Sequence, residues 1–217
     1  MITREIIRER MSARRPRIDD GGAALGGDAD SGNAVAPYRA AVALVLRAGA
    51  SGPEVLFIER AQHDDDPWSG HLSFPGGRLE PGDATLRDAA ERETFEELAL
   101  EFRDAEFLGQ LDDVRGLMIG ILISAFVYFL LEDRPLLPSD EVACAFWVPL
   151  ATLTDPTGRV TEVFRAGDRE VTLPAIDVLG AGRPRLWGLT LRFVEDFVQI
   201  IDATSKPDGA TLGKDVE

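Results

Sequence analysis

Hydrophobic and polar positions along the chain predict a domain that mixes strands with two main helices. Runs rich in β-branched and aromatic residues indicate strands at 39–48, 54–60, 103–111, 117–131 and 141–148, a short one near 71–74, and a weaker pair at 159–164 and 169–174. Helical spacing predicts one helix from Ala84 to about Leu98, with Asp83 suited to cap it. Leu189, Phe193 and Phe197 recur at helical spacing near the chain's end. A mixed sheet with these helices predicts an α/β sandwich.

The longest apolar run, 117–131, reads "LMIGILISAFVYFLL". A membrane-spanning helix needs about 20 apolar residues, and this shorter run is rich in strand-forming side chains. We therefore expect a strand buried on both faces, and a soluble protein without a membrane partner.

The two ends of the chain have a different character from its middle. Residues 1–36 are expected to form a flexible arm with a short helix, because "GGAALGGDADSGNAVAP" is rich in Gly, Ala and Asp without a period. Residues 37–204 are expected to form the folded domain, followed by a polar tail at 205–217.

The negative overall charge argues against a nucleic-acid partner. The formal net charge is −15 and the pI about 4.6, whereas a nucleic-acid binder needs a basic face to displace counterions from phosphates. An anionic small substrate would need local arginines or a metal. The one cysteine, Cys144, excludes an internal disulfide and is expected to be a buried thiol in a reducing cytoplasm.

The segment "ERETFEELAL" (91–100) contains the sequence's most informative charges. On a helix, Glu93, Glu96 and Glu97 share one narrow face, on a stripe that is otherwise apolar. Like charges at this spacing cost a few tenths of a kcal/mol even on an exposed helix, and far more when partly buried without a counter-charge. A solvated acidic face is the common explanation of such a cluster, but a bound divalent cation explains its place on the apolar stripe better.

The loop before this helix, "FPGGRLEPGD", contains Gly76 and Gly77. Adjacent glycines often mark a plain turn, but they also let a backbone approach a ligand or a metal closely. Their place just before an acidic helix favours the second interpretation.

Together these residues resemble the signature of the Nudix hydrolases. Gly77 opens the motif, and "RETFEELAL" closes it with the dense Arg-Glu-x-x-Glu-Glu cluster. "EVACAFWVPL" (141–150) and "LWGLTLRFVEDF" (186–197) extend the resemblance over most of the chain, towards the coenzyme A pyrophosphatase branch. The resemblance implies a Nudix-type α/β/α sandwich with a mixed sheet.

The chain departs from the common motif at several positions. The interval from Gly77 to Arg92 is longer by one residue, and Asp83 replaces a glutamate, as in the coenzyme A branch. Ala99 replaces the last glycine, where the helix ends and a left-handed residue is favoured. In "WSGHLSFPGG", Trp68 and His71 stand where that branch has His and Gln.

The resemblance also implies roles for individual residues. Glu93 and Glu97 would bind Mg²⁺ or Mn²⁺, with Glu96 assisting and the Gly76 carbonyl completing the site. Arg92 would orient the glutamates, or else pair with Asp88 one turn back.

Further roles concern the surroundings of this site. Glu141 is either a more distant ligand or base, or an ordinary loop acid. Arg60, Gly77 and Arg78 are expected at the substrate, although Arg60 also fits a surface arginine.

The implied reaction is metal-dependent hydrolysis of a nucleoside diphosphate derivative. Coenzyme A or acyl-CoA, split into 4′-phosphopantetheine and adenosine 3′,5′-bisphosphate, is the first expectation. ADP-ribose or another nucleotide derivative is the second, and a non-catalytic ligand sensor is the third. The oligomeric state stays open, although Ile2, Ile6 and Ile7 could dock on a partner in a homodimer.

Overall fold

The computed structural model describes residues 2–19, 38–62, 69–116, 120–166 and 169–202. Its helices are α1 (Arg4–Ser12), α2 (Leu86–Leu98), α3 (Leu150–Thr154) and α4 (Gly188–Ile201), with a 3₁₀ turn η1 at Pro156–Gly158. Its strands are β1 (Tyr38–Gly49), β2 (Gly52–Arg60), β3 (Leu72–Ser73), β4 (Gly76–Arg78), β5 (Ala105–Gln110), β6 (Val114–Gly116), β7 (Ile121–Leu130), β8 (Val142–Pro149), β9 (Arg159–Ala166), β10 (Arg169–Ile176) and β11 (Leu186–Trp187).

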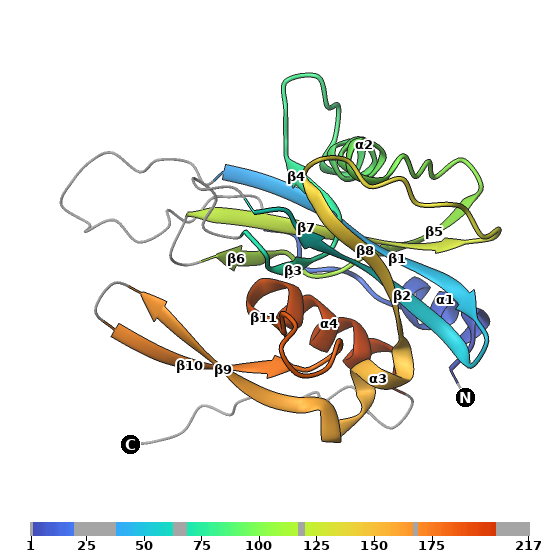
Figure 1. Ribbon diagram of the computed structural model, residues 1–217. Helices are drawn as coiled ribbons and strands as arrows, with labels where there is room; N and C mark the ends of the chain where they lie inside the picture. The colour runs from blue at the N-terminus through green and yellow to red at the C-terminus, as the bar shows by residue number, and fades with distance from the viewer. Residues whose placement is uncertain (1, 20–37, 63–68, 117–119, 167–168, 203–217) are drawn as a thin grey trace, which may run out of the picture.

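The main sheet is mixed, as predicted. Its central path runs β3-β2-β1-β7-β5, with β4 paired to β1, β6 to β7 and β8 to β2. Only β1 and β7 run parallel; the other described pairs are antiparallel. A separate antiparallel sheet, β11-β10-β9, lies beside α4 (Figure 1). The weak strand pair expected near 159–174 is the β9–β10 hairpin of this sheet.

Helices cover both faces of the main sheet, which makes the fold an α/β/α sandwich (Figure 1). Ala89, Ala90 and Leu98 of α2 pack on one face with Tyr128 of β7. Helices α1, α3 and α4 pack on the other, where Phe193 of α4 is buried. Full burial of such a side chain stabilises the fold by roughly 1.5–3 kcal/mol.

Strand β7 confirms the interpretation of the longest apolar run. Its side chains from Ser124 to Leu130 are buried without alternation, because the sheet is covered on both faces. Residues 117–119 lie outside the described part. None of the described helices has the length and apolar character needed to cross a membrane.

Helix α1 confirms the short helix expected near the N-terminus, but it does not belong to a free arm. Ile7 is fully buried and Met11 is 4% exposed, both within the core under the sheet. Ile7 therefore packs on its own domain and is not available to a partner subunit, while Ile2 and Ile6 are partly buried.

The segment after α1 is also fixed to the domain. Arg14 and Arg17 both form ion pairs with Asp112, and the Asp19 backbone N–H donates to Asp113 at 2.8 Å. The expectation of a flexible arm is therefore wrong up to residue 19, because ion pairs and hydrogen bonds hold this segment against the domain. The remainder of the proposed arm, 20–36, and the tail 205–217 lie outside the described residues.

The N-terminal end of α2 differs from the expectation, whereas its C-terminal end agrees with it. Thr85, not Asp83, is the N-cap, and its hydroxyl accepts the Asp88 N–H at 3.1 Å. The helix ends at Ala99, which is left-handed (φ 52°, ψ 28°) and donates its N–H to the Phe95 carbonyl at 2.7 Å. Ala99 is the sole non-glycine residue with positive φ among those described.

Replacing Ala99 with glycine is expected to stabilise the protein. Left-handed backbone costs an alanine about 1–2 kcal/mol, and the greater freedom of glycine in the unfolded chain offsets part of the gain. We expect the free energy of unfolding to rise by about 0.5–1 kcal/mol, measured by urea denaturation. Ala151→Gly, at an exposed right-handed position in α3, is the matched control and should lower it. Equal changes in the free energy of unfolding of both variants would contradict a specific cost of the left-handed backbone at Ala99.

Candidate active site

Strand β4 is where the sheet meets the acidic helix. A Cβ on Gly76, whose φ is +146°, would lie 2.3 Å from the Ala41 carbonyl oxygen. A Cβ on Gly77 would lie 2.3 Å from Glu93 Oε1. Position 76 requires glycine because a Cβ there would meet the backbone of β1, whereas a Cβ at position 77 would displace the flexible Glu93 carboxylate of α2.

Glu97 is the most buried carboxylate of the cluster, with 3% of its surface exposed. The Gly76 backbone N–H donates to its Oε2 at 2.9 Å. Burial raises the pKa of Glu97 to about 8, against the opposing effects of this hydrogen bond and of the Arg60 charge. The charges of Glu93 and Glu141 raise the pKa further.

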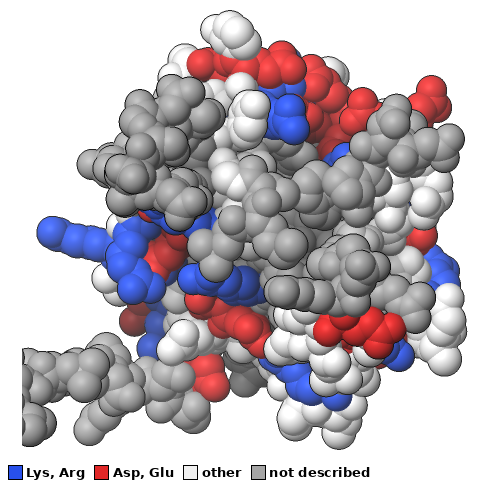
Figure 2. Space-filling view, turned by 90° about the vertical axis from the view of Figure 1, so that its left-hand side faces the viewer, with Lys and Arg blue, Asp and Glu red and all other residues white. Residues whose placement is uncertain are grey.

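Glu93 lies one turn earlier on α2 and is half-buried. Burial is the main cause that raises its pKa, the Arg92 guanidinium acts in the opposite direction, and the charges of Glu96 and Glu141 add to the rise. Glu93 and Glu97 are therefore two neighbouring carboxylates whose burial favours the protonated form. Figure 2 shows further acidic side chains gathered along the upper part of the molecule, where α2 lies in Figure 1.

Arg92 connects the helix to the loop after β4. Its Nε and Nη2 each donate to one oxygen of Asp83 at 3.0 Å, and Nη2 also donates to the Arg78 carbonyl at 3.1 Å. Its Nη1 donates to Glu96 at 2.9 Å and lies 3.1 Å from Glu93 Oε1. Such bidentate, charge-assisted bonds hold geometry well. They raise the pKa of Arg92 above its usual range and hold the pKa of Asp83 below its own.

These contacts decide between the two interpretations of Arg92. Asp88 pairs with the Thr85 hydroxyl at 2.8 Å, so Arg92 does not pair with it. Glu96, expected among the metal ligands, is exposed and bound to Arg92 at the rim of the cluster. The ligand role of Glu96 stays a prediction.

Glu141 comes to the same place from a distant part of the chain. The Ser139 N–H donates to the Glu97 carbonyl at 2.8 Å, and the Ala61 N–H donates to the Glu141 carbonyl at 2.9 Å. The Glu141 side chain is exposed, and its charge acts on both Glu93 and Glu97. The loop before β8 therefore brings a further carboxylate to the cluster.

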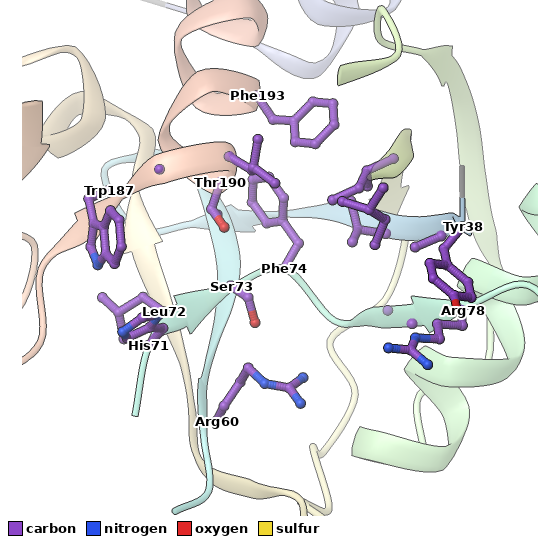
Figure 3. Close-up of a pocket in the computed structure, with 18 residues that line it drawn as sticks. Tyr38, Arg60, His71, Leu72, Ser73, Phe74, Arg78, Trp187, Thr190 and Phe193 are labelled. Carbon is purple, nitrogen blue, oxygen red and sulfur yellow. The ribbon is translucent and has the colours of Figure 1, made fainter. Parts of the chain in front are cut away.

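A cavity of about 730 Å³ lies next to these carboxylates, on the α4 side of the sheet. Arg60, Gly76, Gly77 and Arg78, all predicted site residues, line it. Figure 3 shows Arg60 pointing into it and Arg78 beside Tyr38. Most of the remaining wall is apolar, formed by Tyr38, Val42, Leu72, Phe74, Ile121, Ile123, Trp187, Leu189 and Phe193.

Sequence patterns did not indicate every residue of this region. Tyr38 and Trp187 line the cavity, but no sequence pattern assigns either residue to the site. Asp83 was expected to cap α2. Asp83 instead pairs with Arg92. The signal for this pair in the sequence is an acid in the loop followed nine residues later by an arginine on the helix. Trp68 lies outside the described residues.

The donor set fits a hard divalent cation. Among the described residues no three His, Cys, Asp or Glu side chains converge tightly enough to form a closed metal site. Mg²⁺ and Mn²⁺ do not require one, because they keep several waters and share their shell with substrate phosphates. The clustered carboxylates with raised pKa values supply oxygen ligands and a need for positive charge, and the Gly76 carbonyl as a ligand stays a prediction.

Replacing Gly77 with alanine is expected to reduce turnover of a diphosphate substrate without unfolding the protein. The new methyl group would displace the Glu93 carboxylate, which is the end of a flexible side chain. Displacing a catalytic group by about 1 Å can cost on the order of 10²-fold in rate. Gly82→Ala is the control, because nothing lies within 4 Å of a Cβ built there. Unchanged kcat in Gly77→Ala, or a matching loss in the control, would contradict the assignment.

Comparison with known proteins assigns the fold and the motif to one family. Residues 37–167 match the NUDIX domain. A structure of a MutT/nudix family protein from Enterococcus faecalis superposes with a TM-score of 0.51 at 19% identity, covering 76% of this chain and 62% of that one. The chain therefore belongs to the Nudix family.

Two curated relatives align with the chain. The mitochondrial coenzyme A diphosphatase of Homo sapiens is 32% identical over 171 residues, which are 76% of this chain and 70% of that protein. An uncharacterised protein of Schizosaccharomyces pombe is 39% identical over 118 residues, 49% of this chain and 35% of its own length. The chain thus aligns with about a third of the fission yeast protein.

Proposed function

We propose that the protein is a metal-dependent hydrolase that cleaves the diphosphate bond of coenzyme A or acyl-CoA. The products are 4′-phosphopantetheine, or its acyl form, and adenosine 3′,5′-bisphosphate. The observation that carries the proposal is the buried Glu97 carboxylate, held by the Gly76 N–H with the charges of Glu93 and Glu141 around it, beside a substrate-sized cavity. The human relative's name supports coenzyme A as the substrate.

The chemistry is the attack of water on one phosphorus of the diphosphate. A P–O bond forms, the bridging P–O bond breaks, and the water loses a proton to a carboxylate of the cluster. Mg²⁺ or Mn²⁺ held by Glu93 and Glu97 would neutralise charge on the diphosphate and lower the pKa of the attacking water. Arg60, which lines the cavity and acts through its charge on Glu97, faces the substrate, and Arg92 holds the helix against the loop after β4.

Product analysis tests the proposal. The protein is incubated with coenzyme A and, separately, with ADP-ribose, in Mg²⁺ or Mn²⁺. We expect adenosine 3′,5′-bisphosphate from coenzyme A. Turnover of ADP-ribose alone would contradict coenzyme A as the substrate but agree with diphosphate hydrolysis as the reaction. No hydrolysis of any compound in a wider set of nucleotide derivatives would contradict the reaction itself.

A further inference from the structure

Two residues at one end of the cavity combine an aromatic face with a positive charge. Tyr38 begins β1 and is 60% exposed although it lines the cavity. The guanidinium of Arg78 lies 5.3 Å from the centre of the Tyr38 ring, in a cation–π contact. Figure 3 shows this pair at one side of the cavity, apart from Trp187 and His71 at the other. Arg78 directly follows Gly77, which faces the Glu93 carboxylate, so the pair lies near the carboxylate cluster.

No carboxylate of the described residues neutralises the charge of Arg78. Most arginines of this acidic chain pair with a carboxylate, as Arg92 does with Asp83, but no carboxylate among the described residues forms an ion pair with Arg78. The cavity's other arginine, Arg60, acts through its charge on Glu97, a carboxylate of the proposed metal site. Arg78 is therefore a second, separate cation for an anionic group of the ligand.

The opposite end of the cavity has a different chemistry. His71 and Trp187 meet edge to face with ring centres 4.9 Å apart, and Leu189 and Phe193 continue an apolar wall. An apolar wall suits the pantetheine arm of the proposed substrate. The adenine base and the 3′-phosphate on its ribose then fall at the end where the Tyr38 ring and the Arg78 guanidinium lie.

We propose that Tyr38 and Arg78 form the subsite for the adenosine 3′-phosphate half of the substrate. Tyr38 stacks on the adenine base, and Arg78 forms charge-assisted hydrogen bonds to the 3′-phosphate. This inference rests on the proposed function and assigns the selectivity for coenzyme A over its 3′-dephosphorylated form to a single arginine.

The two residues make separable contributions to affinity. Stacking on an aromatic ring depends on the base, which coenzyme A and dephospho-coenzyme A share. A guanidinium bound to a phosphate depends on the 3′-phosphate, which only coenzyme A carries. Loss of the Tyr38 ring should therefore weaken the binding of both substrates alike, whereas loss of the Arg78 guanidinium should weaken the binding of coenzyme A alone.

The test compares kcat/KM for coenzyme A and dephospho-coenzyme A in the full-length protein and three variants. We expect the wild type to prefer coenzyme A on the order of ten- to a hundredfold. Arg78→Gln should abolish this preference by lowering kcat/KM for coenzyme A alone. Tyr38→Leu should lower kcat/KM for both substrates and leave their ratio unchanged. Tyr38→Phe, which keeps the aromatic ring, should retain both wild-type values. A preference that survives Arg78→Gln would overturn the inference.

A binding measurement separates failure of the inference from failure of the proposed function. Calorimetry with adenosine 3′,5′-bisphosphate and with AMP requires no turnover. Tighter binding of the bisphosphate by the wild type, lost in Arg78→Gln, supports the subsite even if coenzyme A is not hydrolysed, an outcome that would contradict only the proposed substrate. Equal affinity of the wild type for both nucleotides would overturn the subsite, even if coenzyme A is hydrolysed.

Discussion

Glu97→Gln is expected to lower kcat by roughly three orders of magnitude while leaving the protein folded. Glutamine keeps the size of the side chain and an oxygen that can accept the Gly76 N–H, so the substitution removes little besides the charge. A carboxylate that helps to hold a divalent cation contributes several kcal/mol to stabilising the transition state, and each 1.36 kcal/mol is tenfold in rate. Steady-state kinetics with coenzyme A in Mg²⁺ measures the loss.

A matched control distinguishes this role from a general effect of removing acid. Glu101→Gln removes one carboxylate just after α2, where Glu101 forms an exposed ion pair with Arg103. Such pairs contribute little to stability, so activity should stay near that of the wild type. Retention of activity in Glu97→Gln, with a folded protein confirmed by circular dichroism, would show that Glu97 does not take part in the reaction.

Glu97 is also expected to make the metal-free protein less stable as the pH rises. Its pKa is about 8 in the folded protein and 4.5 without the fold's influence, so the fold favours the protonated carboxyl. The stability that this group contributes is fully present below pH 4.5 and is lost as the pH rises through 8. The loss approaches 1.4 kcal/mol per pH unit within this window.

Urea denaturation in the presence of a chelator, from pH 5 to pH 8, measures this effect as a difference. The free energy of unfolding of the wild type should fall relative to that of Glu97→Gln as the pH rises, because the amide does not titrate while all other groups are shared. Adding Mg²⁺ should flatten the difference, since metal binding favours the ionised carboxylate. Parallel pH profiles in the chelator would contradict the raised pKa.

The sheet and the two main helices could be predicted because their apolar patterns follow directly from burial. The unbroken run of β7 matches a strand covered on both faces, and the helical spacing of Phe193 and Phe197 matches the buried side of α4. The glutamate cluster was likewise predictable, because its like charges interrupt an apolar stripe.

Other features depend on contacts between distant parts of the chain, which no local pattern contains. Ile7 is buried because α1 folds back under the sheet, and Asp83 pairs with Arg92 because the loop after β4 returns to the helix. Cys144, expected to be buried, is only partly so on β8. The position of Arg78 over Tyr38 depends on the pairing of β4 with β1.

Calorimetric titration of the metal-free protein with Mn²⁺ tests the central claim most directly. We expect saturable binding by the wild type and a strong loss of affinity in Glu97→Gln and Glu93→Gln, but not in Glu101→Gln. Equal Mn²⁺ affinity in all four proteins would show that the carboxylates around Gly76 and Gly77 do not hold the metal.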